Sequence, residues 1–325
     1  MNIPPAYKVT STILALISEI DSLRLYGKGN NLSKHVTITI RRNSLLRSSL
    51  YSARIEGNQL SELTLHEDNA DTETLEITNI IKALEYLESS QILCIDHLFI
   101  KKIHTTIGNN IFPEKGMYRT EMSGIFNAAD NVVYMPPPPT QMNGLLDELF
   151  KYVNSRSDFP LITAFVAHLI FEKIHPFLDG NGRVGRVLIP AVLKSKNFIV
   201  EFPVTLEEYL DTHRAQYYDV LSQGLQNVES YLEFMLRAYL EQMKKTIEKL
   251  ELQSNKPAVI QELTARQEKL YTIVREHTVV SLNFIARRFL KVPERTLRND
   301  ISKLIEKGLV AKVRNTKGVE YRISE

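Results

Sequence analysis

Residues 175–186 read His175-Pro-Phe-Leu-Asp-Gly-Asn-Gly-Arg-Val-Gly-Arg186. This short stretch combines a titratable base, a carboxylate, small turn-forming residues and two arginines. Histidine titrates near neutral pH, so His175 is the candidate general base. Asp179 offers the hard carboxylate that Mg²⁺ shares with phosphate oxygens. A polar loop with a capping aspartate and two solvated arginines is the plainer interpretation, but the combination favours a phosphate-transfer site.

The flanks of this segment predict two helices. Residues 161–174 are apolar on all sides, which is typical of a fully buried helix. Three small residues, 180–182, interrupt that helix, and residues 184–194 predict a second one that opens directly after them. Small residues at a helix start leave its backbone amides open to an anion. Arg183 and Arg186 are three residues apart, so they share one side of the new helix and can clamp a polyphosphate.

The segment resembles the complete signature of the Fic family of protein adenylyltransferases. The resemblance implies transfer of AMP from ATP to a Ser, Thr or Tyr hydroxyl of a target protein or of the enzyme itself, with release of pyrophosphate and a requirement for Mg²⁺. Carried over by position, His175 would take the proton from the hydroxyl, Asp179 would bind the metal, and Phe177 would anchor the loop in the core. The phosphate-binding positions would be Gly180, Asn181, Gly182, Arg183 and Arg186, with Arg186 at the γ-phosphate.

A second motif, Ser52-Ala-Arg-Ile-Glu56-Gly57-Asn58, resembles the inhibitory motif of the same family and lies ahead of the catalytic signature. Residues 44–57 predict a helix with a small, apolar face, which Gly57 is suited to end. Without a γ-phosphate, Glu56 is the obvious partner for Arg186, and ATP then cannot settle in a productive pose. The resemblance therefore implies autoinhibition through Ser52 and Glu56. For Glu56 alone, a surface carboxylate at a helix end is the alternative.

Between the two motifs, Gly116-Met-Tyr-Arg119 and residues 123–139 resemble the flap of the family, a β-hairpin over the active site. Residues 132–134 favour a strand, residues 128–131 favour a turn, and the prolines 136–139 favour an extended exit. An exposed strand edge can hold a target segment by strand addition. A surface hairpin without a ligand is the alternative.

The sequence predicts a mainly α-helical fold with this small β-hairpin and a C-terminal appendage. The predicted helices of the body are 11–25, 44–55, 73–88, 95–107, 141–153, 161–174, 184–194, 207–222 and 228–252. We assign residues 1–110 to an N-terminal helical region with the inhibitory helix, residues 111–252 to the Fic core, residues 253–262 to a polar linker and residues 263–325 to a C-terminal domain.

The C-terminal domain differs from the body in charge. Residues 256–325 hold 15 Lys and Arg against 8 Asp and Glu, a net charge of +7 that leaves −5 for residues 1–255. Helices at 264–277, 281–289 and 293–307, followed by strands at 309–314 and 319–323, resemble a winged helix-turn-helix. Pro293 would open the recognition helix at its first position. The candidate DNA contacts are Arg295, Thr296, Arg298, Asn299, Lys303 and, at the wing tip, Lys317. Winged helices also bind proteins or form dimers, so DNA, a protein partner and a homodimer all stay open.

Composition sets the remaining bounds. With 325 residues, 43% hydrophobic and 24% charged, the chain can bury a large core in two or more domains. The single cysteine, Cys94, excludes an internal disulfide framework, and its apolar neighbours predict a packed thiol. The N-terminus lacks a signal-peptide pattern and the apolar helix 161–174 is too short to span a bilayer, so we expect a cytoplasmic protein without a membrane partner.

The leading interpretation is an autoinhibited protein adenylyltransferase. One rival is a DNA-binding transcriptional regulator whose Fic body senses nucleotide, although a pure sensor would not need His175. The other rivals are Fic enzymes that remove AMP from a modified protein or transfer another nucleotide, because base recognition lies outside the signature.

Overall fold

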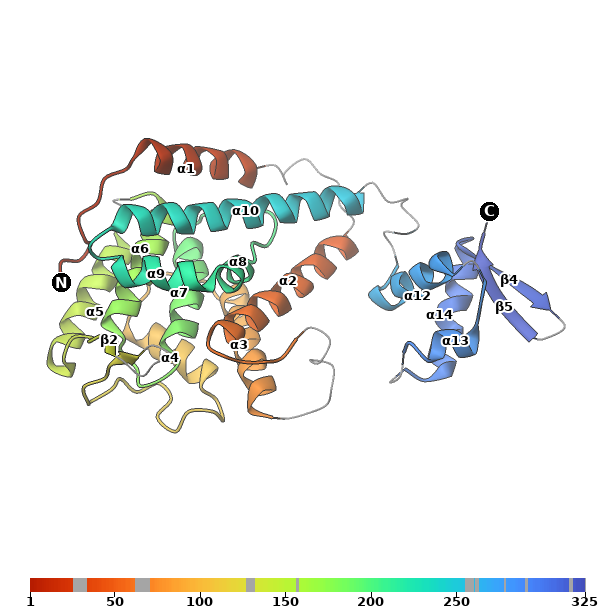
Figure 1. The fold of residues 1–325 in the computed structure, drawn as a ribbon, viewed down its shortest axis with the longest axis horizontal. Helices are drawn as coiled ribbons and strands as arrows, with labels where there is room; N and C mark the ends of the chain where they lie inside the picture. The colour runs from red at the N-terminus through yellow and green to blue at the C-terminus, as the bar shows by residue number, and fades with distance from the viewer. Residues whose placement is uncertain are drawn as a thin grey trace. The chain divides into compact units, whose positions relative to one another are not determined.

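A computed structural model describes residues 1–25, 34–61, 71–126, 132–155, 158–254, 260, 263–277, 279–289, 292–315 and 318–324 (Figure 1). The chain divides into two compact units, Met1–Asn30 with Ile40–Glu248 and Asn31–Thr39 with Lys249–Glu325. The fold is mainly α-helical, as predicted. The elements up to residue 254 are α1 (Ser11–Arg24), α2 (Lys34–Ile55), α3 (Thr72–Ser89), α4 (His97–Ile107), β1 (Ile125–Phe126), β2 (Val132–Tyr134), α5 (Pro139–Asn154), α6 (Pro160–Ile174), α7 (Asn181–Ser195), α8 (Leu206–Thr212), α9 (Arg214–Gln223) and α10 (Val228–Ser254).

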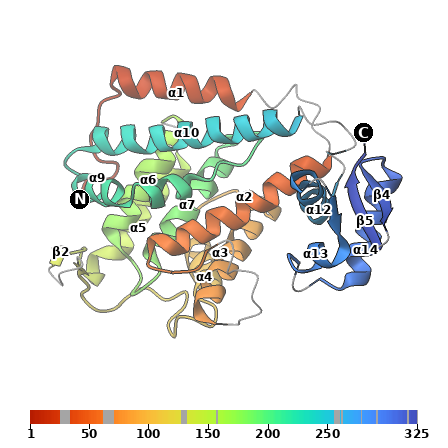
Figure 2. The ribbon, with the colours of Figure 1, turned by 45° about the vertical axis from the view of Figure 1, so that its right-hand side comes forward.

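The antiparallel partners α6 and α7 form the centre of the first unit. Every side chain of α6 from Leu161 to Ile174 is buried, as its all-round apolar sequence predicts. Helix α5 packs against α6, while α3 and α4 pack against α7. Helix α1 runs alongside α10 in both views (Figures 1 and 2), and the Thr10 hydroxyl donates to Glu233 there at 2.9 Å. The connection at residues 175–180 is therefore anchored at both ends by buried helices.

Several helix boundaries differ from the sequence prediction. Helix α2 begins at Lys34, ten residues before the predicted start at Ser44. The helix predicted at 207–222 is divided into α8 and α9, which meet at His213. The prolines 136–139 do not all form an extended exit, because Pro139 is the first residue of α5. Proline is tolerated at this position because the first amides of a helix have no partner within it.

The predicted hairpin is present, and we call the strands β1 and β2 the flap. They pair antiparallel with the register Ile125 to Tyr134 and Phe126 to Val132, and the register shifts between the two pairs. The turn predicted at residues 128–131 lies outside the described residues. Two residue pairs between β1 and β2 are too few to stabilise a hairpin alone. The flap therefore depends on contacts with the helical body.

The second unit has the predicted order of a winged helix-turn-helix. Its elements are α12 (Ala265–Glu276), β3 (Val279–Ser281), α13 (Leu282–Ala286), α14 (Glu294–Glu306), β4 (Val310–Asn315) and β5 (Gly318–Ile323). The sheet order is β3-β5-β4, with both pairs antiparallel. The sequence prediction missed β3, which is only three residues long. Pro293 lies one position earlier than predicted, as the residue that caps α14.

Two further predictions concern the surface of the molecule. Cys94 is exposed, so the prediction of a packed thiol was wrong. Its apolar neighbours do not bury it, because Leu93 also points to solvent and only Ile95 enters the core.

Among the described residues, no helix combines the length and apolarity needed to cross a bilayer. The predicted linker, residues 253–262, lies for the most part outside the described residues, and α10 continues to Ser254.

Asn79 offers a test of how α3 is attached to α4. Its side chain is fully buried, and its Nδ2 donates to Ile107 O at 3.1 Å and Asn109 O at 2.7 Å. We expect Asn79→Ala to lower the free energy of unfolding by about 1–3 kcal/mol, because two carbonyl oxygens at the end of α4 lose their donor. Denaturant titration measures this change, with Ser89→Ala on the exposed end of α3 as the control. A loss no larger than that of the control would contradict the assignment.

Candidate active site

His175 lies at the junction that follows α6. It caps the helix in the left-handed region, with φ 51° and ψ 60°. Its Nδ1 lies 3.3 Å from the backbone oxygen of Glu172. A carbonyl can only accept, so Nδ1 carries the proton and the lone pair is on Nε2. Burial lowers the pKa of His175, and the charge of Arg119 adds to this effect, while Glu56 and Asp179 oppose it. The imidazole is therefore suited to accept a proton at neutral pH.

The loop after His175 is shaped by its own side chains. The Oδ1 of Asn181 accepts from Phe177 N at 2.9 Å, and its Nδ2 donates to Phe177 O at 2.8 Å. Phe177 is fully buried and stacks on His104, with ring centroids 3.7 Å apart. The prediction of Phe177 as an apolar anchor is confirmed. Sequence reasoning assigned the Asn181 side chain to phosphate, and it missed these two bonds, which commit the side chain to the loop.

The start of α7 has the features of an anion site. Gly180 caps the helix with φ 79°, and a Cβ there would lie 2.7 Å from the ring of Phe112. Glycine is therefore needed both for the backbone conformation and for space. The first intrahelical bond runs from Val184 N to Gly180 O at 3.0 Å. The amides of Asn181, Gly182 and Arg183 thus precede the hydrogen-bonded ladder, at the positive end of the helix dipole.

Arg186 is buried, with 2% of its surface exposed, and its guanidinium donates hydrogen bonds to acceptors at the C-terminal end of α2. Its Nε donates to Ser52 Oγ at 2.9 Å, and its Nη2 donates to Ser52 O at 2.9 Å and to Glu56 Oε1 at 2.7 Å. Burial opposes ionisation of Glu56, but the charge of Arg186 and the hydrogen bond to it outweigh burial, so the pKa of Glu56 is lowered. The structure therefore brings Ser52 and Glu56 into contact with Arg186. The sequence analysis paired Glu56 with Arg186 although 130 residues separate them.

The Glu56 carboxylate also occupies the space above the anion site. A Cβ on Gly182 would lie 2.3 Å from Glu56 Oε1, so this carboxylate lies directly over the first turn of α7. The hydroxyl of Tyr218 on α9 donates to Ile55 O at 3.1 Å, next to the end of α2. Tyr218 was not among the predicted site residues, because nothing in the local sequence distinguishes it from other helix tyrosines.

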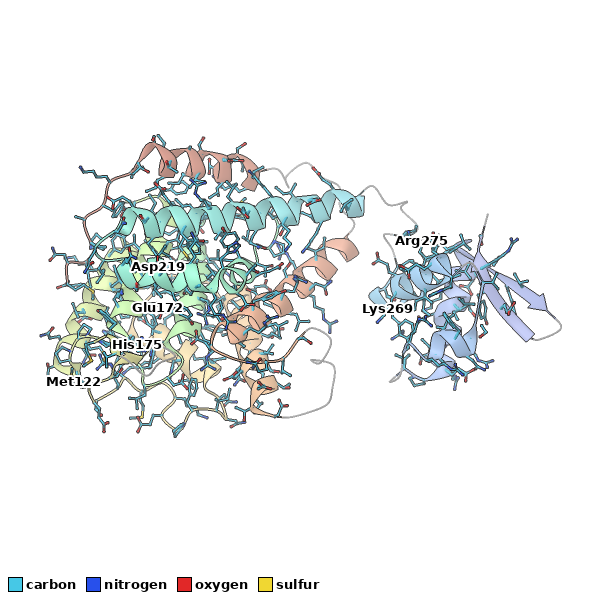
Figure 3. The ribbon with its side chains drawn as sticks, in the orientation of Figure 1. Met122, Glu172, His175, Asp219, Lys269 and Arg275 are labelled. Atoms are coloured by element: carbon cyan, nitrogen blue, oxygen red, sulfur yellow. The ribbon has the colours of Figure 1, made fainter. Side chains whose placement is uncertain are left out.

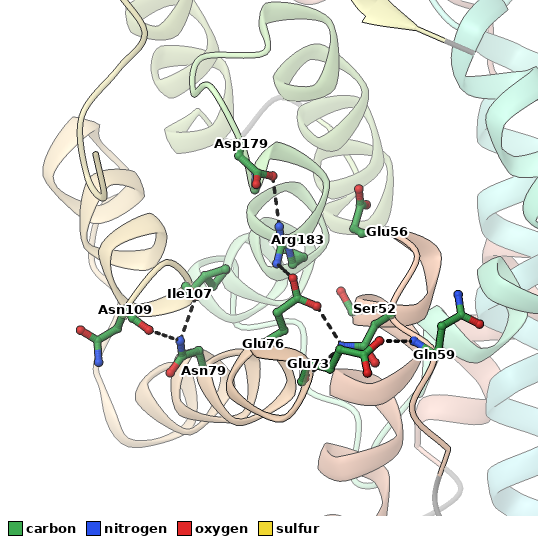
Figure 4. A network of polar contacts seen from close by, with 12 residues as sticks. Ser52, Glu56, Gln59, Glu73, Glu76, Asn79, Ile107, Asn109, Asp179 and Arg183 are labelled. Carbon is green, nitrogen blue, oxygen red and sulfur yellow. Dashed lines mark hydrogen bonds and ion pairs between the residues drawn. The ribbon is translucent and has the colours of Figure 1, made fainter. Parts of the chain in front are cut away.

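Arg183 and Asp179 belong to a polar network that extends to α3 (Figure 4). Arg183 Nη2 donates to Asp179 Oδ1 at 3.1 Å, and Nη1 donates to Glu76 Oε1 at 2.9 Å. The other oxygen of Glu76 accepts from Asn58 Nδ2 at 2.8 Å. The sequence analysis missed Glu76, since a lone glutamate on a helix carries no recognisable signal. Glu76 connects the chain after α2 with the first turn of α7.

Asp179 fits the metal role that the sequence assigned to it. The side chain is 68% exposed, so one face of the carboxylate is open to solvent even though Arg183 pairs with Oδ1. The described residues contain no cluster of three or more His, Cys, Asp or Glu side chains that could hold a metal alone. A single carboxylate is nevertheless the donor set that Mg²⁺ uses when phosphates supply other oxygens. Asp179 together with a bound polyphosphate would therefore hold the ion.

A second imidazole, His104 on α4, supports the loop from behind. Gly116 N donates to His104 Nδ1 at 2.7 Å, so His104 Nε2 carries the proton and donates to Asp179 O at 3.0 Å. Burial lowers the pKa of His104, which favours this neutral form. The backbone at Asp179 is thus attached to α4 and to the segment that leads to the flap.

The candidate DNA contacts belong to the second unit. Arg295, Arg298, Asn299 and Lys303 are exposed on α14, and Thr296 is half-buried. Arg298 is paired with Glu294 at 2.7 Å. Asp300 points inward, where it accepts from Gln267 and Arg266 of α12, so it does not lie on the exposed face. Lys317 lies outside the described residues.

Glu172 is a buried carboxylate in the last turn of α6, close to His175 (Figure 3). None of the described residues donates a hydrogen bond to its Oε1, and His168 Nε2 lies 3.7 Å away. His168 is itself neutral, because burial lowers its pKa to about 3, and it is hydrogen-bonded to Tyr231 and Tyr217. Burial raises the pKa of Glu172 to about 8, although Arg186 opposes this.

This raised pKa predicts a pH dependence of stability. The protonated Glu172 carboxyl group contributes its full stabilisation below the ordinary pKa of 4.5. This stabilisation is lost progressively as the pH rises from there through the folded-state pKa of about 8. Relative to Glu172→Gln, the wild type should lose up to about 1.4 kcal/mol per pH unit over this range. Denaturant unfolding at pH 5.5 and pH 7.5 measures the difference, with exposed Glu248→Gln as the control. Parallel stability curves for wild type and Glu172→Gln would show that the carboxyl group is not buried as a neutral acid.

Comparisons with known proteins identify the families that this chain resembles. The model of the Fic/DOC family matches residues 94–193, and that of the DeoR-like helix-turn-helix domain matches residues 266–320. The protein adenylyltransferase Fic of Aedes aegypti is 28% identical over 188 residues, which cover 53% of this chain and 35% of that protein. A probable protein adenylyltransferase of Aquifex aeolicus is 32% identical over 31% of this chain and 30% of its own length. The chain thus spans about a third of these two relatives.

In other comparisons the match covers most of the other protein's length. A Fido domain-containing protein of Dictyostelium discoideum is 34% identical over 116 residues, which cover 34% of this chain and 78% of that protein. A crystal structure of a Fic family protein from Desulfovibrio desulfuricans has a TM-score of 0.71 at 22% identity over 98% of both chains. Fic-1 from C. elegans has a TM-score of 0.62 at 22% identity over 74% of this chain and 73% of its own. The chain therefore belongs to the Fic/DOC family and carries a DeoR-like helix-turn-helix domain at its C-terminal end.

Proposed function

We propose that this protein is an autoinhibited protein adenylyltransferase, which transfers AMP from ATP to a Ser, Thr or Tyr hydroxyl of a target protein or of itself. The observation that carries the proposal is the junction of α6 and α7. There a neutral His175 with its Nε2 lone pair free precedes a helix start with Arg183 and Arg186 in its first turns. The relatives named as protein adenylyltransferases support the same reaction.

The proposed step is an in-line displacement at the α-phosphorus of ATP. His175 Nε2 accepts the proton of the hydroxyl, whose oxygen forms the new bond to phosphorus. The bond from that phosphorus to the β-phosphate bridging oxygen breaks, and pyrophosphate leaves. The amides at the start of α7 and the guanidinium groups of Arg183 and Arg186 would bind the phosphate oxygens, where negative charge must be stabilised. Mg²⁺, held by Asp179 and the phosphates, would supply further charge neutralisation when bound.

The inhibitory part of the proposal follows from the state of Arg186. A γ-phosphate would need the guanidinium that Glu56 and Ser52 already hold. The carboxylate over Gly182 adds a second obstacle, because it places negative charge where phosphate oxygens would bind. Helix α2 is also attached to the core by Arg47 to Glu208 at 2.9 Å and Arg54 to Asp211 at 3.3 Å. Release of inhibition therefore requires Glu56 to leave Arg186 despite these attachments of α2.

Glu56→Gly tests both the reaction and the inhibition. We expect the variant, incubated with Mg²⁺ and ATP, to incorporate label from α-labelled ATP and none from γ-labelled ATP, at least about tenfold more than the wild type, because one charge-assisted hydrogen bond is removed. Intact mass should show the addition of AMP. Glu56→Gln, which keeps the shape of the side chain without its charge, should lie between the two.

The control for the chemistry is His175→Ala in the Glu56→Gly background. This double variant should still bind ATP, as judged by thermal shift, but should incorporate no AMP. Equal labelling of wild type and Glu56→Gly would refute the inhibitory role of Glu56. Label from the γ-phosphate would indicate phosphoryl transfer and would refute the transfer of AMP. No label from either position would make removal of AMP or transfer of another nucleotide the leading reaction.

A second candidate function belongs to the helix-turn-helix unit. We propose that it binds duplex DNA through α14, because Arg295, Asn299 and Lys303 form an exposed polar surface on that helix. The inward orientation of Asp300 removes one negative charge from this surface. The net charge of +7 over residues 256–325 favours attraction to phosphate.

DNA binding can be measured by fluorescence anisotropy with a labelled random duplex at several salt concentrations. We expect Lys303→Ala to weaken binding and to lower the salt slope by about one unit, as loss of a phosphate contact does. Arg275→Ala, which removes an exposed cation from α12 instead of α14 (Figure 3), should leave both unchanged. Equal effects of the two substitutions, or no binding by the wild type at low salt, would exclude α14 as a DNA-binding surface.

A further inference from the structure

We propose that Arg119 is a positioning residue, which fixes the flap against the turn that carries His175. Its guanidinium joins the two ends of the flap segment to the C-terminal end of α6. The catalytic consequence of this inference rests on the proposed function, whereas the mechanical part can be measured without any activity.

Arg119 is among the most deeply buried charged residues described, with 1% of its surface exposed. A guanidinium removed from water needs its donors satisfied. Its Nε donates to His175 O at 2.8 Å, Nη1 donates to Glu121 O at 2.9 Å, and Nη2 donates to Pro137 O and to Ile174 O, the latter at 3.4 Å. Every one of these acceptors is a backbone carbonyl. Arg119 therefore acts on the course of the chain, and the identities of the accepting side chains do not matter.

The first pair of acceptors lies at the end of α6. The last carbonyls of a helix have no partner within it, and they form the negative end of its dipole. Ile174 O and His175 O are two such groups, and Arg119 supplies both a donor and a positive charge to them. The backbone of Arg119 adds a bond from its own N to Pro176 O at 2.9 Å. Three consecutive carbonyls around His175 are thus held by one residue.

This turn needs such support because His175 is not a glycine. Its φ of 51° lies in the left-handed region, which costs energy for a residue with a Cβ. Such a conformation persists only where neighbouring contacts fix it. The bonds from Arg119 to the carbonyls on both sides of the turn provide that constraint, and the turn sets the direction in which the imidazole leaves the chain.

The second pair of acceptors brackets the flap. Glu121 precedes β1 and Pro137 follows β2, so the two arms of one guanidinium hold both ends of the hairpin segment. Lys173 on α6 provides a second connection. Its Nζ lies 4.4 Å from the centre of the Tyr134 ring on β2 and donates to Ser222 O at 2.9 Å. The last turn of α6 therefore carries the base and both attachments of the flap.

This geometry requires arginine. The planar guanidinium presents donors in several fixed directions, so one side chain can reach four carbonyls on two segments. A lysine keeps the charge but concentrates its donors at one point, so it cannot satisfy both segments together. If the flap receives the target by strand addition, its distance from His175 Nε2 decides whether the hydroxyl meets the base.

The test uses Arg119→Lys in the full chain, with Arg24→Lys on α1 as the matched control. Hydrogen exchange followed by mass spectrometry should show faster exchange in residues 121–126 and 132–137, with the interior of α6 unchanged. In the Glu56→Gly background, ATP binding by thermal shift should stay within about twofold, while the rate of AMP incorporation should fall by about 10- to 100-fold. Loss of rate without loss of ATP binding separates a displaced flap from a damaged fold.

The outcomes separate the inference from the proposed function. Unchanged exchange in the flap segment would overturn the inference, whatever the activity. Faster exchange together with an unchanged rate of AMP incorporation would overturn the positioning role. If the Glu56→Gly parent incorporates no AMP, the proposed function fails, and the exchange measurement alone decides whether Arg119 holds the flap. If Arg119→Lys does not fold, Tyr134→Leu removes the other attachment and should speed exchange in residues 132–137, and unchanged exchange there would count against the inference.

Discussion

The buried charge of Arg186 is the constraint on which the arrangement around it depends. A guanidinium cannot be taken out of water without acceptors, and here α2 supplies them through Ser52 and Glu56. Because these acceptors come from a helix 130 residues earlier in the chain, the same interaction that stabilises the folded site also occupies it. The structure thus contains a positive group that a polyphosphate and a carboxylate of the chain itself would both satisfy.

The second constraint is the turn at His175. Two buried helices, α6 and α7, meet through a loop of six residues, and the chain passes through a left-handed residue to make the connection. Asn181 fixes the loop from inside, His104 holds it from α4, and Arg119 holds it from the flap side. Each of the three side chains forms hydrogen bonds with backbone groups of the loop. They fix the geometry of the loop without using Arg183, Arg186 or the Asp179 carboxylate.

The polar network around Glu76 links these two constraints. Glu76 on α3 binds Arg183, which also binds Asp179, and it accepts from Asn58 directly after α2. The chain at the end of α2 is therefore connected, through the Glu76 carboxylate, to a second arginine in the first turn of α7. A displacement of α2 would therefore change the contacts of both arginines, of Arg186 directly through Glu56 and of Arg183 through Asn58 and Glu76.

Much of this protein could be predicted from its sequence, because the relevant signals are local. The motifs at residues 175–186 and 52–58 are runs of neighbouring residues that resemble a known family. Propensity or periodicity over a few turns predicts the apolar α6, the hairpin and the elements of the winged helix-turn-helix. The errors were local as well. The break between α8 and α9 and the short β3 carry weak signals, and the exposure of Cys94 depends on which face of its segment packs.

Helix packing, by contrast, decides which groups from distant parts of the chain come into contact. Glu76, His104, Arg119 and Tyr218 have ordinary sequence surroundings, and nothing in those surroundings shows that they reach the loop at residues 175–183. Their contacts arise because α3, α4 and α9 pack around the α6–α7 pair, and packing depends on the shapes of whole helix faces. The order of residues in the loop and in α2 already specifies which chemical groups the site contains. The fold decided how they are held, because a buried donor or acceptor takes whichever partner the packing brings within reach.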